Sequence, residues 1–328
     1  MLLIALNPVA DAFILPQIKI SGTVPHFVKD SVKFMFSQFS VIQTRLLMLL
    51  IWSAIFLLNP QPLTLLLEYG GFTLLGIIGA TFANATGAGG GVVFVPFFKQ
   101  MAFSAETTVA TSFAIQCCGM TAGALTWWGF YRQQQRHSPD WQRLPGALLL
   151  TVPAAMMGLL LVQFNPQWFG DFVSPETLHS GFGVFSVLLA LALFATVPLL
   201  KRQVFRHSFS TFDRVCLPLI ALFGGGITAW LSIGVGELVA VYLIMRGFNV
   251  TFAIAAAVIV SAFSVWAGIV FHLLETQAVY WPVVLFAGAG AIIGGILAKH
   301  LVLKFSPKDL KLFFASWILL MGLSSLLL

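Results

Sequence analysis

The chain carries little charge. Only 9% of its 328 residues are charged while 59% are hydrophobic, and the mean hydropathy of +0.96 lies far above the range of soluble domains. So few charges exclude an ordinary solvated surface and predict an integral membrane protein. The net charge of +6 is what lysine and arginine on cytoplasmic loops would produce, so no nucleic-acid partner is expected.

Cysteine is scarce as well. Cys117, Cys118 and Cys216 all lie in apolar segments, and we interpret them as small packing residues rather than a disulfide framework. The apolar runs contain no histidine, cysteine or carboxylate set at the spacing of a metal site or an activated nucleophile. The sequence therefore predicts neither an enzyme nor a cofactor or metal site.

Apolar runs are what the chain has in abundance. A helix needs about 20 predominantly apolar residues to cross a bilayer. We predict seven such spans: Phe39–Leu58, Glu106–Phe130, Leu144–Phe164, Leu178–Leu200, Val250–Leu274, Tyr280–Leu301 and Leu310–Leu328.

One stretch, ATGAGGGVVFVPF from Ala85 to Phe97, has four glycines in five positions of an apolar run. Backbone inside a membrane must find partners, so such a break predicts a segment that lines a polar cavity. Residues 92–98 would form a half-helix whose free N–H groups face the break, which is a site for an anion. Asn84 and Thr86 add polar side chains. Close helix packing is the alternative explanation for the glycines.

The chain contains an internal repeat. A shift of 145 positions pairs Gly79 with Gly224 and aligns the glycines of the first break with a second, weaker break. Each copy has a broken segment followed by three spans. We predict four parts: a cytoplasmic-face segment with an extra helix over 1–62, the first repeat over 63–200, a cytoplasmic linker over 201–213 and the second repeat over 214–328.

The basic residues indicate how the copies are oriented. If each broken segment crosses the membrane once, the 17 lysines and arginines divide into 7 and 10. If each is a re-entrant hairpin, they divide into 16 and 1, with Lys99 the exception. The span Phe39–Leu58 contains Gln43 and Arg45, and without it the division becomes 12 to 5.

The sequence therefore predicts an all-α polytopic membrane protein with two inverted repeats, each a re-entrant broken helix plus three transmembrane helices, and one extra N-terminal helix. The first hairpin enters from outside and the second from the cytoplasm. The N-terminus is then cytoplasmic and the C-terminus lies outside.

Hydroxyl side chains follow the first break at helical spacing, and they could donate to the oxygens of an anion or bond to their own backbone one turn earlier. In the second copy the corresponding break is formed by LSIGVGE. The predicted substrate-binding set is Asn84, Thr86, Gly87, Gly89, Gly90, Gly91, Thr108, Thr111, Ser112, Ser232, Gly234 and Gly236.

Of the eleven acidic residues, Glu237 alone falls deep in a predicted membrane segment, at the start of the second half-helix. A carboxylate there is costly unless it is protonated or paired. We predict that Glu237 takes up and releases a coupling proton. The alternative is a carboxylate that caps the half-helix without titrating.

At these residues the chain resembles the sulfite exporter TauE/SafE family. Residues Gly87–Pro96 resemble its first glycine motif, and Ala110–Ser112 resemble the small-hydroxyl step of its next helix. The resemblance extends over residues 63–328 and implies an inner-membrane permease for small sulfur-containing anions such as sulfite or organosulfonates. The second motif departs from the family pattern, because Ser232–Gly236 replaces a fuller glycine run and Glu237 follows it.

We therefore predict a proton-coupled secondary transporter that works by alternating access. Its partners would be a small anion of the sulfite or organosulfur class and the lipid bilayer, with a homo-oligomer left open. Two alternatives remain. The first is a cation carrier or channel that uses Glu237 as ligand, and the second is a membrane assembly factor without transport activity.

Overall fold

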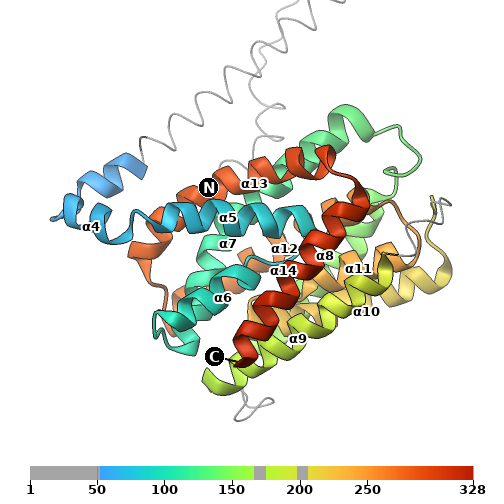
Figure 1. The fold of residues 1–328 in the computed structure, drawn as a ribbon. Helices are drawn as coiled ribbons and strands as arrows, with labels where there is room; N and C mark the ends of the chain where they lie inside the picture. The colour runs from blue at the N-terminus through green and yellow to red at the C-terminus, as the bar shows by residue number, and fades with distance from the viewer. Residues whose placement is uncertain (1–49, 51, 166–174, 198–205, 328) are drawn as a thin grey trace, which may run out of the picture. The chain divides into compact units, whose positions relative to one another are not determined.

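The computed structural model describes residues 50, 52–165, 175–197 and 206–327. All regular structure in these residues is helical (Figure 1). The predicted segment 1–38 and most of the predicted first span lie outside the described residues. The chain divides into two compact units, Met1–Thr64 and Leu65–Leu328. In the first unit, residues 52–57 form a short helical run.

The labelled helices give the fold of the remaining chain. They are, in chain order, α4 (Pro62–Tyr69), α5 (Phe72–Thr86), α6 (Gly91–Gln100), α7 (Ala105–Phe130), η1 (Tyr131–Gln135), α8 (Leu144–Gln163), α9 (Pro175–Thr196), α10 (Thr211–Leu231), α11 (Val235–Met245), α12 (Val250–Phe271), η5 (His272–Thr276), α13 (Trp281–Lys304) and α14 (Pro307–Leu327).

Among the described residues, five helices are long and apolar enough to cross a membrane, and the bent pair α4 and α5 would make a sixth. The five are α7, α8, α10, α12 and α13. This confirms the prediction of a multi-pass helical membrane protein. One element differs from expectation, because α10 has 21 residues and is long enough to span by itself.

Both predicted breaks are present, and each follows a helix that ends in the left-handed region. α5 ends at Gly87 with φ of 79°, and α10 ends at Ser232 with φ of 61°. These two residues are related by the repeat offset of 145. Glycine adopts this backbone conformation without strain, whereas serine must be held in it. The next helices begin at Gly91 and Val235, as the sequence predicts for the half-helices.

The helix after the first break folds back along the helix before it. A Cβ atom on Gly79 of α5 would lie 2.8 Å from the ring of Phe94 on α6. Further from the break, the rings of Phe72 and Phe97 meet edge to face with centroids 5.9 Å apart. Because Phe72 begins α5 and Phe97 lies near the end of α6, the segment is a helical hairpin with its open end at these rings.

The second broken segment folds in the same way. A Cβ atom on Gly224 of α10 would lie 2.8 Å from the Cα of Val235 at the start of α11. At the other end of α11, Arg246 Nε lies 2.6 Å from Asp213 Oδ1 in the first turn of α10. The hairpin is therefore closed by an ion pair at its open end.

The two hairpins open toward opposite ends of α7. Phe103, just before α7, packs against Tyr280, whose hydroxyl lies 2.7 Å from that of Tyr69 near the start of the first hairpin. Asp140, after α7, accepts a hydrogen bond of 3.1 Å from Asn249, which directly follows the second hairpin. The 26 residues of α7 separate the two open ends by about 39 Å.

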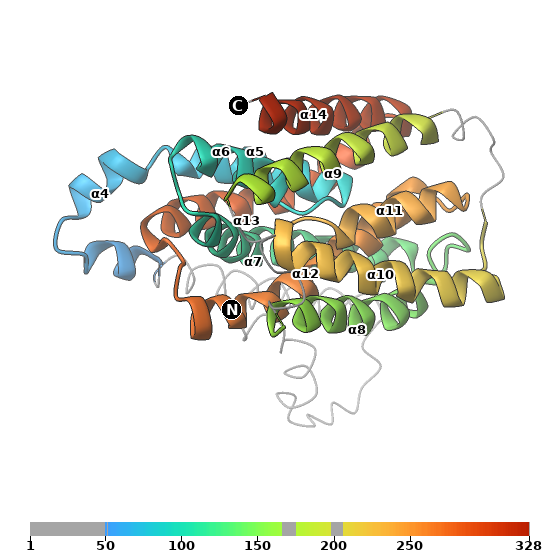
Figure 2. The same cartoon turned by 90° about the horizontal axis from the view of Figure 1, so that it is seen from below.

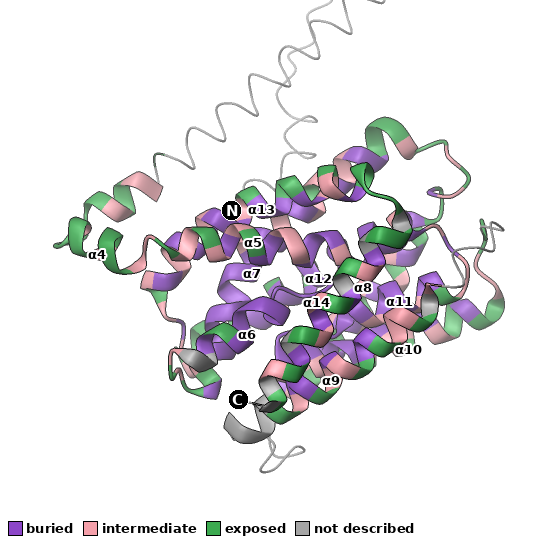
Figure 3. Ribbon diagram, viewed as in Figure 1, coloured by how far each residue is buried: buried purple, intermediate pink, exposed green. Residues whose placement is uncertain are grey.

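Each hairpin packs on a helix of the other repeat. Gly290 of α13 lies against the carbonyl of Thr73 on α5, and Gly158 of α8 lies against the carbonyl of Leu222 on α10. These glycines let the helix backbones approach closely. α7 and α12 lie in the buried centre, while α9 and α14 lie side by side (Figures 2 and 3). The hairpin of each repeat therefore packs against the other repeat, and this brings the two breaks to the centre of the fold.

Candidate functional site

The two breaks meet each other. A Cβ atom on Gly91 would lie 2.6 Å from the carbonyl oxygen of Ser232, and one on Gly236 would collide with the carbonyl oxygen of Gly87. The two contacts are the same contact with the copies exchanged, because an offset of 145 relates Gly91 to Gly236 and Gly87 to Ser232. Glycine at positions 91 and 236 is thus required by the backbone of the opposite break.

Glu237 joins the two breaks through its carboxylate. It lies in the first turn of α11, where Oε2 accepts a hydrogen bond of 2.8 Å from Gly234 N–H, and Oε1 accepts one of 2.7 Å from Gly89 N–H. The residue is only 3% exposed. The carboxylate therefore caps α11, which is the alternative role considered for it, and also holds an amide of the first break. Its coupling role stays a prediction.

We call the place where the two breaks meet, with Glu237 between them, the junction. Gln116 of α7 completes it. Its Oε1 accepts a hydrogen bond of 2.8 Å from Gly90 N–H, and its Nε2 donates to Ser232 Oγ at 2.8 Å and to Ser112 Oγ at 3.1 Å. Sequence reasoning missed this residue. A signal was present, since Gln116 is the one amide side chain in α7 and lies one turn after the predicted Ser112.

Ser112 and Ser232 are hydrogen-bonded to each other. The Oγ of Ser232 donates to the Oγ of Ser112 at 2.9 Å, and both residues are fully buried. The positive φ of Ser232 is uncommon for a residue with a side chain, and the bonds to Ser112 and Gln116 hold it there. Backbone strain of this kind, about 1 kcal/mol or more, persists only where the surroundings impose it.

Ser261 of α12 is a second residue that sequence reasoning missed. An offset of 145 relates it to Gln116, and it lies against Gly236 at the junction. It is 2% exposed, and its hydroxyl has no hydrogen-bond partner among the described residues. A buried hydroxyl without a partner is uncommon, and each one calls for a physical explanation.

Asn84 and Thr86 are close in sequence to the first break but are bonded to the backbone. Asn84 donates to the carbonyls of Ala80 and Gly119 at 2.8 and 3.3 Å. Thr86 donates to Phe82 O at 2.9 Å and accepts from the N–H of Ala88 at 3.0 Å. The structure therefore gives both side chains a part in shaping the end of α5.

The three predicted hydroxyl residues of α7, Thr108, Thr111 and Ser112, lie in different surroundings. Ser112 faces the junction, whereas Thr111 Oγ1 accepts a hydrogen bond of 3.0 Å from Tyr280 N–H, toward the open end of the first hairpin. Thr108 is fully buried, and its hydroxyl has no partner among the described residues. Neighbouring positions on a helix point about 100° apart, so Thr111 and Ser112 serve different surroundings.

The polar residues of the junction are buried, with Glu237 3% exposed, Gln116 2% and Ser232 0%. A cavity beside the first break, lined by residues that include Thr86, Val92 and Trp317, has a volume of about 10 Å³, which holds no more than one water molecule. A larger hollow of about 630 Å³ lies along α8 between Val152 and Asn165, and none of the junction residues lines it. Within the described part of the chain, no group of histidines, cysteines and carboxylates could hold a metal ion.

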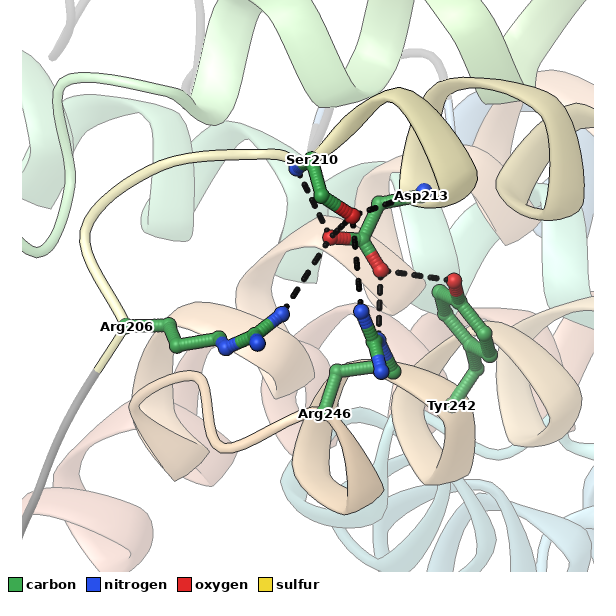
Figure 4. A network of polar contacts seen from close by, with 5 residues as sticks. All are labelled: Arg206, Ser210, Asp213, Tyr242 and Arg246. Carbon is green, nitrogen blue, oxygen red and sulfur yellow. Dashed lines mark hydrogen bonds and ion pairs between the residues drawn. The ribbon is translucent and has the colours of Figure 1, made fainter.

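A second buried polar cluster closes the open end of the α10–α11 hairpin (Figure 4). Asp213 is fully buried and pairs with Arg246 at 2.6 Å and with Arg206 at 3.7 Å. Tyr242 and Ser210 donate hydroxyl hydrogen bonds of 2.8 and 2.7 Å to the same carboxylate. The sequence predicts Asp213 as the last residue of a linker, but α10 begins at Thr211, so the residue belongs to the hairpin.

The fold and the junction define a polytopic helical membrane protein in which two broken helical segments meet at a buried polar site. The family model "Sulfite exporter TauE/SafE" matches residues 72–325, from the first residue of α5 into α14. The chain belongs to this family, a family of membrane transporters, which confirms the resemblance seen in the sequence. No curated protein and no solved structure gives a significant match.

Proposed function

We propose that this chain is a secondary transporter that moves small sulfur-containing anions across the cell inner membrane by alternating access. The observation that carries the proposal is the convergence of amide N–H groups from both breaks on one carboxylate, that of Glu237. Amides at helix starts favour negative groups. The family description, a sulfite exporter, supports sulfite and organosulfonates as the substrate class.

The polarity of the junction favours an anion over a cation. Gly89 and Gly234 direct N–H donors at the shared carboxylate. The carbonyls of Gly87 and Ser232, which a cation would need, lie against Gly236 and Gly91 of the opposite break, and Ser232 O also accepts a hydrogen bond of 3.1 Å from Gln116 Nε2. A cation carrier would require a different arrangement, in which carbonyl oxygens and the carboxylate converge on one position that the ion occupies.

The two repeats are inverted in this proposal, and each hairpin is re-entrant. The supporting observations are the exchanged contacts of Gly91 with Ser232 and Gly236 with Gly87, and the opening of the hairpins toward opposite ends of α7. Arg246 and the Asp140 loop lie at the end that carries most of the basic residues. That end is cytoplasmic by the distribution of basic residues.

Alternating access then requires one entrance to the site from each side of the membrane. On the outer side, Tyr69, Phe103 and Tyr280 pack together at the open end of the first hairpin. On the cytoplasmic side, the Asp213–Arg246 pair closes the second hairpin. Rocking of one repeat against the other would separate the breaks toward one side at a time, with the anion held between them. Glu237 would carry the coupling proton.

The test is a flux assay in proteoliposomes with sulfite, thiosulfate, sulfoacetate and chloride, each with and without a pH gradient. We expect the wild type to move at least one sulfur anion faster with the gradient, and Glu237→Gln to lose the effect of the gradient. Glu106→Gln, an exposed acid at the start of α7, is the matched control and should behave as wild type. Movement of a monovalent cation without any of these anions would contradict the proposal, and so would the absence of any flux.

A further inference from the structure

We propose that the carboxylate of Glu237 is a tethered substitute for the substrate: it occupies the anion position between the two breaks and must leave that position when an anion binds. This inference rests on the proposed function. It goes beyond a general coupling role, because it states where the carboxylate sits, which donors it competes for and how the affinity for the anion must change with pH.

The geometry places the carboxylate where a small oxyanion would be held. Its two oxygens each take one amide donor, from Gly89 at 2.7 Å and from Gly234 at 2.8 Å, and the donors come from different breaks. A sulfite or sulfonate group presents oxygens of the same kind to the same donors. Two N–H groups cannot serve both anions at once, so the two compete for one position.

The charges around Glu237 determine whether both anions can stay. The described residues form no salt bridge to Glu237. Ionisable groups near the breaks make contacts of their own: Cys117 of α7 bonds to Val265 O, Asp213 of α10 to Tyr242 of α11 and to Arg246 just after α11, and His272, the first residue of η5, contacts Gln163. Lys311 of α14 is a further buried cation, and it forms no salt bridge to Glu237. α5 carries no ionisable residue. A second negative charge in this buried site therefore requires that the carboxyl take up a proton.

A group that can receive the displaced carboxyl is already present. Ser261 lies against Gly236, the residue before Glu237, is 2% exposed and has a hydroxyl without a partner among the described residues. A hydroxyl can accept from a protonated carboxyl or donate to its carbonyl oxygen. Gly90 N–H meanwhile stays with the neutral Gln116, so the exchange concerns the amides held by Glu237.

The experiment measures thiosulfate binding to the purified full chain in lipid nanodiscs. Thiosulfate keeps its charge over the range used, about pH 5.5 to about pH 8.5. We expect the wild-type affinity to fall with rising pH, by about tenfold per pH unit above the titration of the carboxyl. Glu237→Ala should bind tightly at every pH, because its site is vacant, and Glu237→Gln should also lose the pH dependence. Glu106→Gln is the control and should follow the wild type.

A measurement on the wild type alone guards against variants that fail to fold. Thiosulfate added to the protein in weakly buffered solution should cause uptake of about one proton per bound anion. Binding to wild type and Glu237→Ala with equal affinity and no proton uptake would overturn the inference and leave the transport proposal standing. Weaker binding by Glu237→Ala at every pH would overturn it as well. No binding of any tested anion by any variant would instead overturn the proposed function.

Discussion

Trp266 of α12 donates its indole N–H to Thr121 Oγ1 of α7 over 2.7 Å, and the two residues are 145 positions apart. This is the offset that aligns the glycines of the two breaks. α7 and α12 therefore contact each other through equivalent positions of the two copies.

Gly91→Ala should abolish transport and destabilise the protein. The added methyl group would lie 2.6 Å from the backbone carbonyl oxygen of Ser232, which cannot move without opening the contact between the breaks, and overpacking of this kind costs about 1 to 3 kcal/mol. The control is Gly146→Ala on α8, where nothing lies within 4 Å of the new methyl group. Flux and melting temperature should be measured for both, and equal flux in the two variants would contradict the prediction.

Gln116→Leu should reduce transport strongly. It leaves Gly90 N–H buried without its acceptor and removes two hydrogen bonds that hold Ser232 at positive φ, at a cost of about 1 to 3 kcal/mol in stability. Gln163→Leu on α8 is the matched control, because Gln163 is also buried but bonds to Gly268 O and His272 instead. Gln163→Leu should lose a comparable amount of stability and keep its flux. If both variants lose flux in proportion to stability, Gln116 has no special role.

Asp213→Asn should lower the melting temperature much more than Asp309→Asn. Both aspartates accept from a serine hydroxyl three residues earlier at the start of a helix, at 2.7 and 2.6 Å. Asp213 is fully buried and also pairs with Arg246, which is partly exposed, so we expect a loss of about 2 to 3 kcal/mol. For the exposed cap the loss should be about 0.5 to 1 kcal/mol. Equal shifts would show that the pair does not stabilise the hairpin.

The orientation of the repeats can be measured by cysteine labelling in a background in which the three native cysteines are replaced. Ser208→Cys and Lys304→Cys should react with an impermeant reagent from one face of the membrane. Glu106→Cys and Glu275→Cys should react from the other face, because their segments adjoin the open end of the first hairpin. All four positions are exposed, and a permeant reagent should label all of them. Reaction of Lys304→Cys and Glu275→Cys from the same face would contradict the inverted arrangement.

The sequence was sufficient for the features that depend on neighbouring residues. Four glycines in five positions interrupt any helix, so the break and the half-helix that begins at Gly91 could be predicted. The burial of Glu237 at the start of α11 followed equally from its place in an apolar run. The membrane class followed from hydropathy alone, because a chain with so little charge cannot form a solvated surface.

The partners of these residues were decided only by the tertiary structure. Glu237 bonds to Gly89 across 148 positions, and Gln116 bonds to Ser232 across 116. Asp213 is the last residue of the predicted linker, and its burial becomes visible only when α11 folds back and brings Arg246 to it. Local patterns determine where a helix breaks. Which donors a buried carboxylate or amide finds depends on how distant helices pack, because the side chains of one helix are satisfied by the backbone of another.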